Sequence, residues 1–221
     1  MKPALDLRLY GVLDPARTRG RDPVALATLA AAGGMTLLQL RDKASCTRDL
    51  VDLARSVRAV IRPHGVPLLV NDRVDVALAA RADGVHVGLT DMAPSDARRL
   101  LGAEALLGIT VHHAHEAAAV EPGLADYAGL GPVYPTASKD PGDPPLGPEG
   151  LARLIEAVRR HHPALPVCGI AGIDHGNAAA VIAAGADGVA VISDIFMAED
   201  VEAAARRLRA VVDQAFTERQ A

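Results

Sequence analysis

Polar residues at an alternating spacing indicate a site for a phosphorylated ligand. Gln39, Arg41 and Lys43 follow an apolar segment, and a strand there would place all three side chains on one side. An arginine binds phosphate oxygens through two N–H groups, and a lysine supplies a compact charge. Lys43 is also one of three lysines among 23 basic residues, which suggests that lysine itself is needed there. The alternative is a salt-bridged strand end with Asp42 as the partner.

Two carboxylates follow the next two apolar segments. Asp72 lies in Asn71-Asp72-Arg73, and Asp91 follows Thr90. Two carboxylates beside a basic cluster suit a Mg²⁺ ion that is shared with phosphate oxygens. The alternatives are that Asp72 caps a helix and Asp91 caps a turn.

Hydroxyls and glycines near later segments indicate a second, smaller anion site. Thr136–Lys139 follows one segment, where Lys139 can neutralise a leaving group, and Gly169–Ile173 and Ser193 end the last two. Thr110 ends an earlier segment and offers a separate hydroxyl that faces the barrel mouth. Glycine allows the close approach of a backbone to a phosphate, and hydroxyls bind its oxygens. The alternatives are an ordinary polar surface loop and a glycine that packs a helix on a strand. A diphosphate site facing a monophosphate site suggests a transfer reaction with loss of diphosphate.

The elements that must position these residues alternate between strands and helices. The expected strands are Leu7–Leu13, Thr36–Leu40, Pro67–Val70, Gly84–Val87, Leu106–Val111, Tyr127–Leu130, Pro166–Ile170 and Gly188–Ile192. The expected helices are Pro23–Ala32, Thr47–Arg62, Arg73–Ala80, Pro94–Leu101, Ala114–Val120, Pro148–His162, Asp174–Ala184 and Asp200–Phe216. A long loop is expected over Pro135–Gly150.

This alternation predicts an α/β fold, a single-domain (β/α)8 TIM barrel over residues 1–221. The active site is then expected at the carboxyl ends of the strands. The alternative is an open, doubly wound sheet. Ala82–Val87 resembles Ala186–Val191, which suits either a half-barrel duplication or simply a good sequence for a turn entering a strand.

Composition excludes several classes of protein. Half of the residues are hydrophobic, so the chain can form a large core, and the net charge of −4 gives no basic field for nucleic acid or an anionic membrane. The two cysteines form no disulfide framework, and neither a signal peptide nor a long apolar span is evident. We therefore expect a soluble, cytoplasmic protein that binds no nucleic acid and no membrane.

These motifs resemble the thiamine-phosphate synthase family from about Leu9 to Val212. The motifs that carry the resemblance are Gln39-x-Arg41-x-Lys43, Asn71-Asp72-Arg73, Gly84-Val85-His86-Val87-Gly88 leading to Asp91, Gly131-Pro132-Val133-Tyr134-Pro135-Thr136 leading to Lys139, and Gly169-Ile170-Ala171-Gly172-Ile173. The resemblance implies a transferase of the alkyl or aryl type on a (β/α)8 barrel.

The resemblance also implies a role for each site residue. Asp72 and Asp91 would hold one Mg²⁺ ion, and Arg41, Lys43, Lys139 and Thr110 would act in catalysis. The residues expected to bind substrates are Gln39, Leu40, Arg41, Asp42, Lys43, Asn71, Thr110, Thr136, Ala137, Ser138, Lys139, Gly172, Ile192 and Ser193. The family joins an aminopyrimidine methyl diphosphate to a thiazole phosphate, and diphosphate leaves before the thiazole nitrogen attacks.

Two departures from the family bear on the thiazole phosphate. Ala171 stands where the family often has glycine, and Asp194 stands where it often has alanine. Because they add a methyl group and a negative charge, we expect a lower affinity for that substrate. The rival readings are a thiazole tautomerase-like isomerase, which typically has a histidine at the position of Pro132, and a non-catalytic phosphate-binding barrel. The expected partners are small molecules, and a homo-oligomer remains open.

Overall fold

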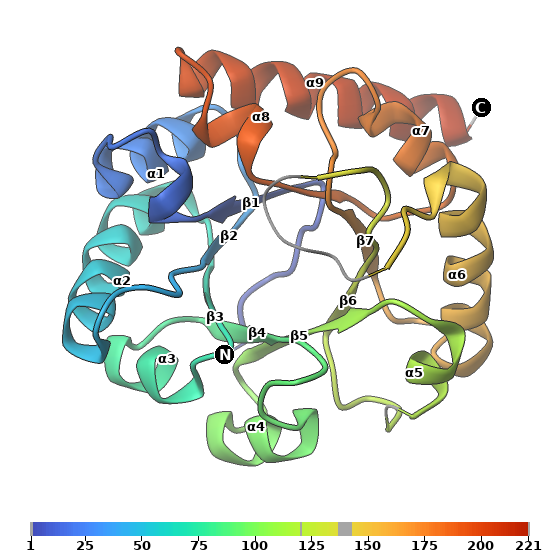
Figure 1. Ribbon diagram of the computed structural model, residues 1–221, viewed down its shortest axis with the longest axis horizontal. Coiled ribbons are helices and arrows are strands. Elements are labelled where there is room, and N and C mark those ends of the chain that lie inside the picture. The colour runs from blue at the N-terminus through green and yellow to red at the C-terminus, as the bar shows by residue number, and fades with distance from the viewer. Residues whose placement is uncertain (1, 120, 137–142, 221) are drawn as a thin grey trace.

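The structure, a computed structural model, describes residues 2–119, 121–136 and 143–220. Eight parallel strands close into a barrel in chain order, and the first pairs with the last through Leu9 and Val189. Figure 1 looks into this barrel, with the helices forming an outer ring. The predicted (β/α)8 barrel is therefore confirmed. The strands are β1 (Leu9–Leu13), β2 (Leu37–Leu40), β3 (Leu68–Asn71), β4 (Gly84–Val87), β5 (Leu106–Val111), β6 (Tyr127–Leu130), β7 (Val167–Ile170) and β8 (Val189–Val191).

The helices follow the strands that they cover. They are α1 (Pro23–Ala32), α2 (Thr47–Ile61), α3 (Val74–Ala80), α4 (Pro94–Leu101), α5 (Ala114–Ala119), α6 (Gly147–His161), α7 (Ala178–Ala183), α8 (Ser193–Phe196) and α9 (Val201–Gln220), with short 3-10 helices η1 (Pro15–Arg17) and η2 (Arg62–His64). No helix in the described ranges is both long enough and apolar enough to cross a lipid bilayer.

Local sequence signals explain where several helices begin and end. Asp22 caps α1 by accepting hydrogen bonds from Val24 N at 3.0 Å and Ala25 N at 3.3 Å, and Pro23 opens the helix where its missing N–H costs nothing. Gly33 ends the same helix. α4 likewise begins with Pro94 and ends before a glycine.

Several predictions of the elements are wrong. β1 begins at Leu9, not at Leu7, and α9 continues to Gln220, beyond its predicted end at Phe216. α7 begins at Ala178, not at Asp174, because the Asp174 carboxylate accepts hydrogen bonds from Gly176 N and Asn177 N and forms a turn first. The short helix α8 was not predicted. The loop after β6 was expected to reach Gly150, but α6 already begins at Gly147.

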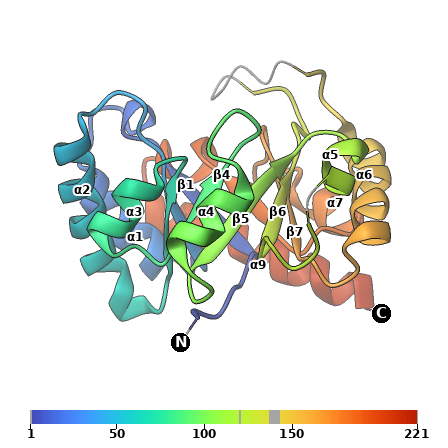
Figure 2. The same cartoon turned by 90° about the horizontal axis from the view of Figure 1, so that it is seen from below.

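The pleat of the strands divides the core into two parts. Inward side chains such as Leu37, Leu69 and Leu106 fill the amino-terminal half of the barrel, where Leu7 also packs. Outward side chains such as Leu38 contact the helices in a second, larger cluster. Full burial of one leucine stabilises the fold by about 1.5–3 kcal/mol. Figure 2 shows the N-terminus at the end of the barrel opposite the loops that follow the strands.

Short polar side chains join neighbouring strands at the amino end of the barrel. Asp83, before β4, accepts a hydrogen bond from Leu68 N at 2.9 Å, and Asp187, before β8, accepts one from Val167 N at 3.0 Å. Asp126, before β6, accepts one from Leu107 N at 2.8 Å. This shared task gives a local reason for the resemblance between the segments around Asp83 and Asp187.

Removal of one of these carboxylates should destabilise the fold. Asp126→Ala leaves the buried Leu107 N–H without its acceptor, and Arg98 loses its carboxylate partner at 2.8 Å. We expect a loss of about 2 kcal/mol in the free energy of unfolding, measured by urea denaturation. The matched control is Glu156→Ala, which breaks an exposed ion pair with Arg160 and should cost about 0.5 kcal/mol or less. Equal losses in the two variants would contradict this role of Asp126.

Candidate active site

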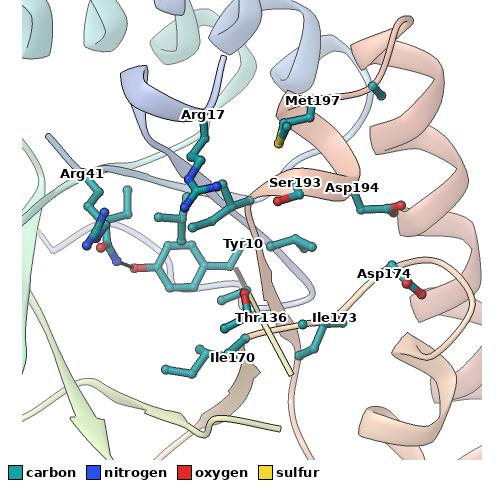
Figure 3. Close-up of a pocket in the computed structure, with 18 of the residues that line it drawn as sticks. Tyr10, Arg17, Arg41, Thr136, Ile170, Ile173, Asp174, Ser193, Asp194 and Met197 are labelled. Carbon is teal, nitrogen blue, oxygen red and sulfur yellow. Dashed lines mark hydrogen bonds between the residues drawn. The ribbon is translucent and has the colours of Figure 1, made fainter. Parts of the chain in front are cut away.

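A cavity of about 780 Å³ opens at the carboxyl ends of the strands. Its lining comes from β1 to β5, from the loop after β6, and from the ends of β7 and β8. In Figure 3, Arg41 lies to the left of the Tyr10 ring, Arg17 lies above it, and Ser193 and Asp194 lie to its right. The predicted site residues at this cavity are Gln39, Arg41, Asn71, Thr110, Thr136, Gly172, Ile192 and Ser193.

Each cation near the end of β2 is paired with a carboxylate. Arg41 Nη1 lies 2.5 Å from Asp14 Oδ2, and Asp14 is buried at the start of η1. Lys43 forms an ion pair with Asp72, while more than half of the lysine side chain stays exposed. An anionic ligand would therefore meet two cations that are already held in place.

Asp72 and Asp91 come together at the rim formed by β3 and β4. Burial and the neighbouring Asp91 carboxyl raise the pKa of Asp72, although Lys43 acts in the opposite direction. Asp91 Oδ2 also accepts a hydrogen bond from Gly88 N at 2.8 Å, which fixes its orientation. Two carboxyl groups this close repel each other when both are ionised, and a bound cation would relieve that repulsion.

The donor set at this rim suits magnesium better than zinc. In the part of the chain that the structure describes, no group of three or more His, Cys, Asp or Glu side chains is arranged to hold a metal ion. Mg²⁺ is commonly held by one or two carboxylates together with substrate phosphates, and it keeps several waters. Asp72 and Asp91 fit that pattern, because the remaining ligands would come from outside the protein.

The opposite rim is a backbone loop after β7. Ala171 and Gly172 have φ values of 73° and 67°, in the left-handed region. A side chain on Gly172 would come within 2.5 Å of Pro135 O, so glycine is also required by the close packing of this loop against the loop after β6. Tyr134 N donates to Ala171 O at 3.1 Å, which joins the two loops.

Asp194 is bound by a neighbouring histidine. His175 donates from its backbone N to Asp194 Oδ2 at 3.1 Å, and its Nδ1 lies 2.9 Å from Asp194 Oδ1. In Figure 3 the Asp194 carboxylate lies beyond Ser193 as seen from Tyr10. The negative charge that the sequence adds to this rim is thus met by hydrogen-bond donors on the protein itself.

Several predicted site residues are not among those that line the cavity. Lys43, Asp72 and Asp91 form the cluster described above, after β2, β3 and β4. The Leu40 side chain is fully buried in the layer between strands and helices, so only its backbone is available to a ligand. The Asp42 carboxylate accepts hydrogen bonds from Ala44 N and Ser45 N and forms the turn before α2. Ala137, Ser138 and Lys139 lie outside the described residues.

Sequence reasoning missed several residues at or beside the cavity. Tyr10 and His86 lie inside the barrel and line it. Arg17 enters from η1, and Asp14 holds Arg41. A lone histidine in an otherwise apolar strand was the available signal for His86, and nothing in the local pattern marks the others.

The closed parallel barrel has Arg41 and a glycine loop at one cavity, and the Lys43–Asp72 pair follows the same strands. These features define the class of (β/α)8 barrels that bind phosphorylated small molecules. A family model described as thiamine monophosphate synthase matches residues 9–195. The chain belongs to this family.

Individual relatives agree with that assignment. The thiamine-phosphate synthase of Chloroflexus aurantiacus is 47% identical over 208 residues, 94% of each chain. That of Solidesulfovibrio magneticus is 48% identical over 214 residues, 97% of this chain and 99% of that protein. The solved thiamine phosphate pyrophosphorylase from Pyrococcus furiosus superimposes with a TM-score of 0.82 at 36% identity, covering 95% of this chain and 96% of that one.

The repulsion between the two carboxylates makes a prediction about stability. Asp91→Asn removes one negative charge beside Asp72, and its amide oxygen still accepts from Gly88 N. Without divalent cations at pH 7, we expect the free energy of unfolding to rise by about 1 kcal/mol in urea denaturation. Asp75→Asn is the control, because Arg73 lowers the pKa of Asp75 and that substitution should bring no gain. A destabilised Asp91→Asn variant would show that the two carboxylates do not repel.

Proposed function

We propose that this protein joins an aminopyrimidine methyl diphosphate to a thiazole phosphate, or to its carboxylate, and produces thiamine phosphate and diphosphate. With the carboxylate, CO2 would leave as well and a proton would take its place. One observation carries the proposal: Arg41 lines one rim of a cavity, the Lys43–Asp72 pair follows the same strands, and a backbone loop with a hydroxyl forms the other rim. Two phosphorylated substrates can therefore bind with their reacting ends facing each other. Membership of the thiamine monophosphate synthase family supports the same reaction.

The β2 to β5 rim would bind the pyrimidine substrate. Gln39, Asn71 and Thr110 line the cavity with polar groups that can hold a pyrimidine ring. Arg41 and Lys43 would bind the diphosphate. Asp72 and Asp91 would hold one Mg²⁺ ion. When bound there, that ion would neutralise negative charge on the departing diphosphate.

The β6 to β8 rim would bind the thiazole phosphate. Thr136 and Ser193 offer hydroxyls, and the backbone at Gly172 and Ile192 lies beside them at the cavity wall. Ala137 and Ser138 are proposed for the same phosphate from the family motif, and Lys139 for the diphosphate. The two rims keep like-charged phosphates apart while the rings meet between them.

The proposed reaction is a substitution in two steps. The bond between the methylene carbon and the diphosphate oxygen breaks, and both electrons leave with the diphosphate. The thiazole nitrogen then shares its lone pair with the pyrimidine-methyl cation and forms the new C–N bond. No proton has to be removed, so the protein needs cations for the leaving group and correct positioning of both rings.

We further propose that residues 1–221 act as one catalytic domain in the cytoplasm, with small molecules as its substrates. The cysteines support the location, because Cys46 and Cys168 are both free thiols in the structure.

The direct test is an assay with the purified full chain. Mg²⁺, the pyrimidine diphosphate and the thiazole phosphate are mixed, and thiamine phosphate and diphosphate are measured together. Equal amounts of the two products, lost on addition of EDTA, are the expected result. A folded protein that binds either substrate but yields no product would favour the tautomerase-like or the regulatory reading.

Asp72→Asn tests the proposed metal site. We expect the Mg²⁺ concentration for half-maximal activity to rise by at least about 10-fold, because one charged ligand is lost and about 1.4 kcal/mol of binding free energy with it. Asp96→Asn is the matched control, since Asp96 is an exposed carboxylate paired with Arg99. An unchanged Mg²⁺ requirement in Asp72→Asn would remove Asp72 from the metal site.

The Asp194–His175 pair predicts a selective effect on the thiazole phosphate. His175→Ala takes the imidazole from Asp194 and leaves its charge facing the phosphate. We expect KM for the thiazole phosphate to rise about 5-fold, about 1 kcal/mol, with KM for the pyrimidine substrate unchanged. Asp194→Asn should abolish the effect of His175→Ala in the double variant. Additive effects of the two substitutions would show that His175 does not act through Asp194.

A further inference from the structure

Five buried side chains form one chain of hydrogen bonds across the inside of the barrel. Gln39 Nε2 donates to Tyr10 Oη, and Tyr10 Oη lies 2.7 Å from Tyr127 Oη. Tyr127 Oη lies 2.8 Å from His86 Nδ1, and His86 Nε2 lies 2.8 Å from Thr110 Oγ1. All five are at most 8% exposed. The chain begins and ends at residues of the pyrimidine rim, Gln39 and Thr110.

Glycines in the neighbouring strands leave room for the rings of this hydrogen-bond chain. Side chains on Gly108 or Gly129 would approach them, since a Cβ on Gly108 would overlap the hydroxyl end of Tyr127, and one on Gly129 would lie 3.5 Å from the His86 ring. Tyr10 and Tyr127 also pack edge to face, with centroids 5.7 Å apart. The rings therefore have one available position, and the order of contacts is set by packing.

The direction of the chain follows from its first donor. An amide N–H only donates, so Tyr10 Oη accepts from Gln39. A hydroxyl has one hydrogen, so Tyr10 donates to Tyr127 and Tyr127 donates to His86 Nδ1. Burial raises the pKa of both tyrosines, which keeps their hydroxyl hydrogens in place. A neutral imidazole that accepts at Nδ1 has its hydrogen on Nε2, and it donates that hydrogen to Thr110 Oγ1.

We propose that this chain makes Thr110 a hydrogen-bond donor to the ligand, and that Tyr127 and His86 are positioning residues that act through Thr110. Thr110 Oγ1 already accepts from His86, so its own hydrogen is directed to a group that accepts. Among the described residues, the structure shows one hydrogen bond of the Thr110 side chain, and its partner is His86. The matching ligand group is a lone pair, either a ring nitrogen of a pyrimidine or an oxygen of its diphosphate.

The inference rests on the proposed function for the identity of this ligand, but the direction of the chain is testable without it. In the full-length protein labelled with ¹⁵N-histidine, the signals of His86 are identified by their loss in His86→Gln. We expect the hydrogen on Nε2 and an unprotonated Nδ1 that loses its hydrogen bond in Tyr127→Phe. A hydrogen on Nδ1 in the unsubstituted protein would overturn the inference, whether or not the protein makes thiamine phosphate.

Kinetics then separate positioning from simple packing. Thr110→Val should lower kcat/KM for the pyrimidine diphosphate about 100-fold, which is the size expected when an active site loses one hydrogen-bond donor. Thr110→Ser keeps the hydroxyl and should retain most of the original kcat/KM. KM for the thiazole phosphate should not change in either variant. The two ligand atoms are distinguished with inorganic diphosphate, whose Kd rises in Thr110→Val if the acceptor is a phosphate oxygen and stays constant if it is a ring nitrogen.

The conservative variant of His86 gives the decisive comparison. A glutamine amide can place an N–H near the position of Nε2, whereas leucine cannot. We therefore expect kcat/KM of His86→Gln to stay within about 5-fold of the value for the unsubstituted protein, and kcat/KM of His86→Leu to fall as far as that of Thr110→Val. Melting temperatures identify variants that fail to fold. Folded His86→Gln and His86→Leu variants with equal activity would overturn the positioning role, as would a Thr110→Val variant with normal activity.

Discussion

Closure of the parallel barrel is the constraint on which the rest of the structure depends. Every strand must send alternate side chains into one enclosed space, and a one-residue slip would exchange inward and outward sets. In the amino-terminal half that space holds apolar side chains such as Leu37 and Leu106. In the other half it holds Gln39, His86 and Thr110, whose polar atoms must find partners inside the barrel. The hydrogen-bond chain across the barrel gives these polar atoms their partners, and it places ordered polar groups at the floor of the cavity.

The charges at the cavity mouth obey a related requirement. Arg41 and Lys43 are held by Asp14 and Asp72, so each of these two cations already has a carboxylate partner on the protein. Because pairing orients the cations before a ligand arrives, less side-chain entropy is lost when the ligand binds. It also means that a bound anion competes with protein carboxylates. A cation at Asp72 and Asp91 would release Lys43 from that competition, which couples the proposed metal site to the proposed diphosphate site.

The sequence predicts the elements well and the contacts between them less well. Alternation places Gln39 and Arg41 inside the barrel, because period two is a local property of a strand, and the structure agrees. Leu40 and Asp42, which we also expected to bind substrate, are separated from the cavity by the same alternation. Tyr10, Tyr127 and His86 pair across strands that are far apart in the chain, and no local spacing encodes such pairs. The pairing of Asp194 with His175 could not be predicted from local spacing for the same reason, since His175 belongs to the preceding loop.

The aspartates at the two ends of the barrel have different tasks. At the amino end, carboxylates such as Asp126 and Asp187 accept hydrogen bonds from neighbouring strands and stabilise closure. At the carboxyl end, Asp72 and Ala171 have positive φ values of 61° and 73°, a conformation that costs a residue with a side chain about 1–2 kcal/mol. Aspartate tolerates this region better than alanine, because its short polar side chain forms local hydrogen bonds. Strain of this kind persists only where the surroundings enforce it. The joined strands at one end thus allow the other end to hold a carboxylate and a backbone loop in the positions that the cavity requires.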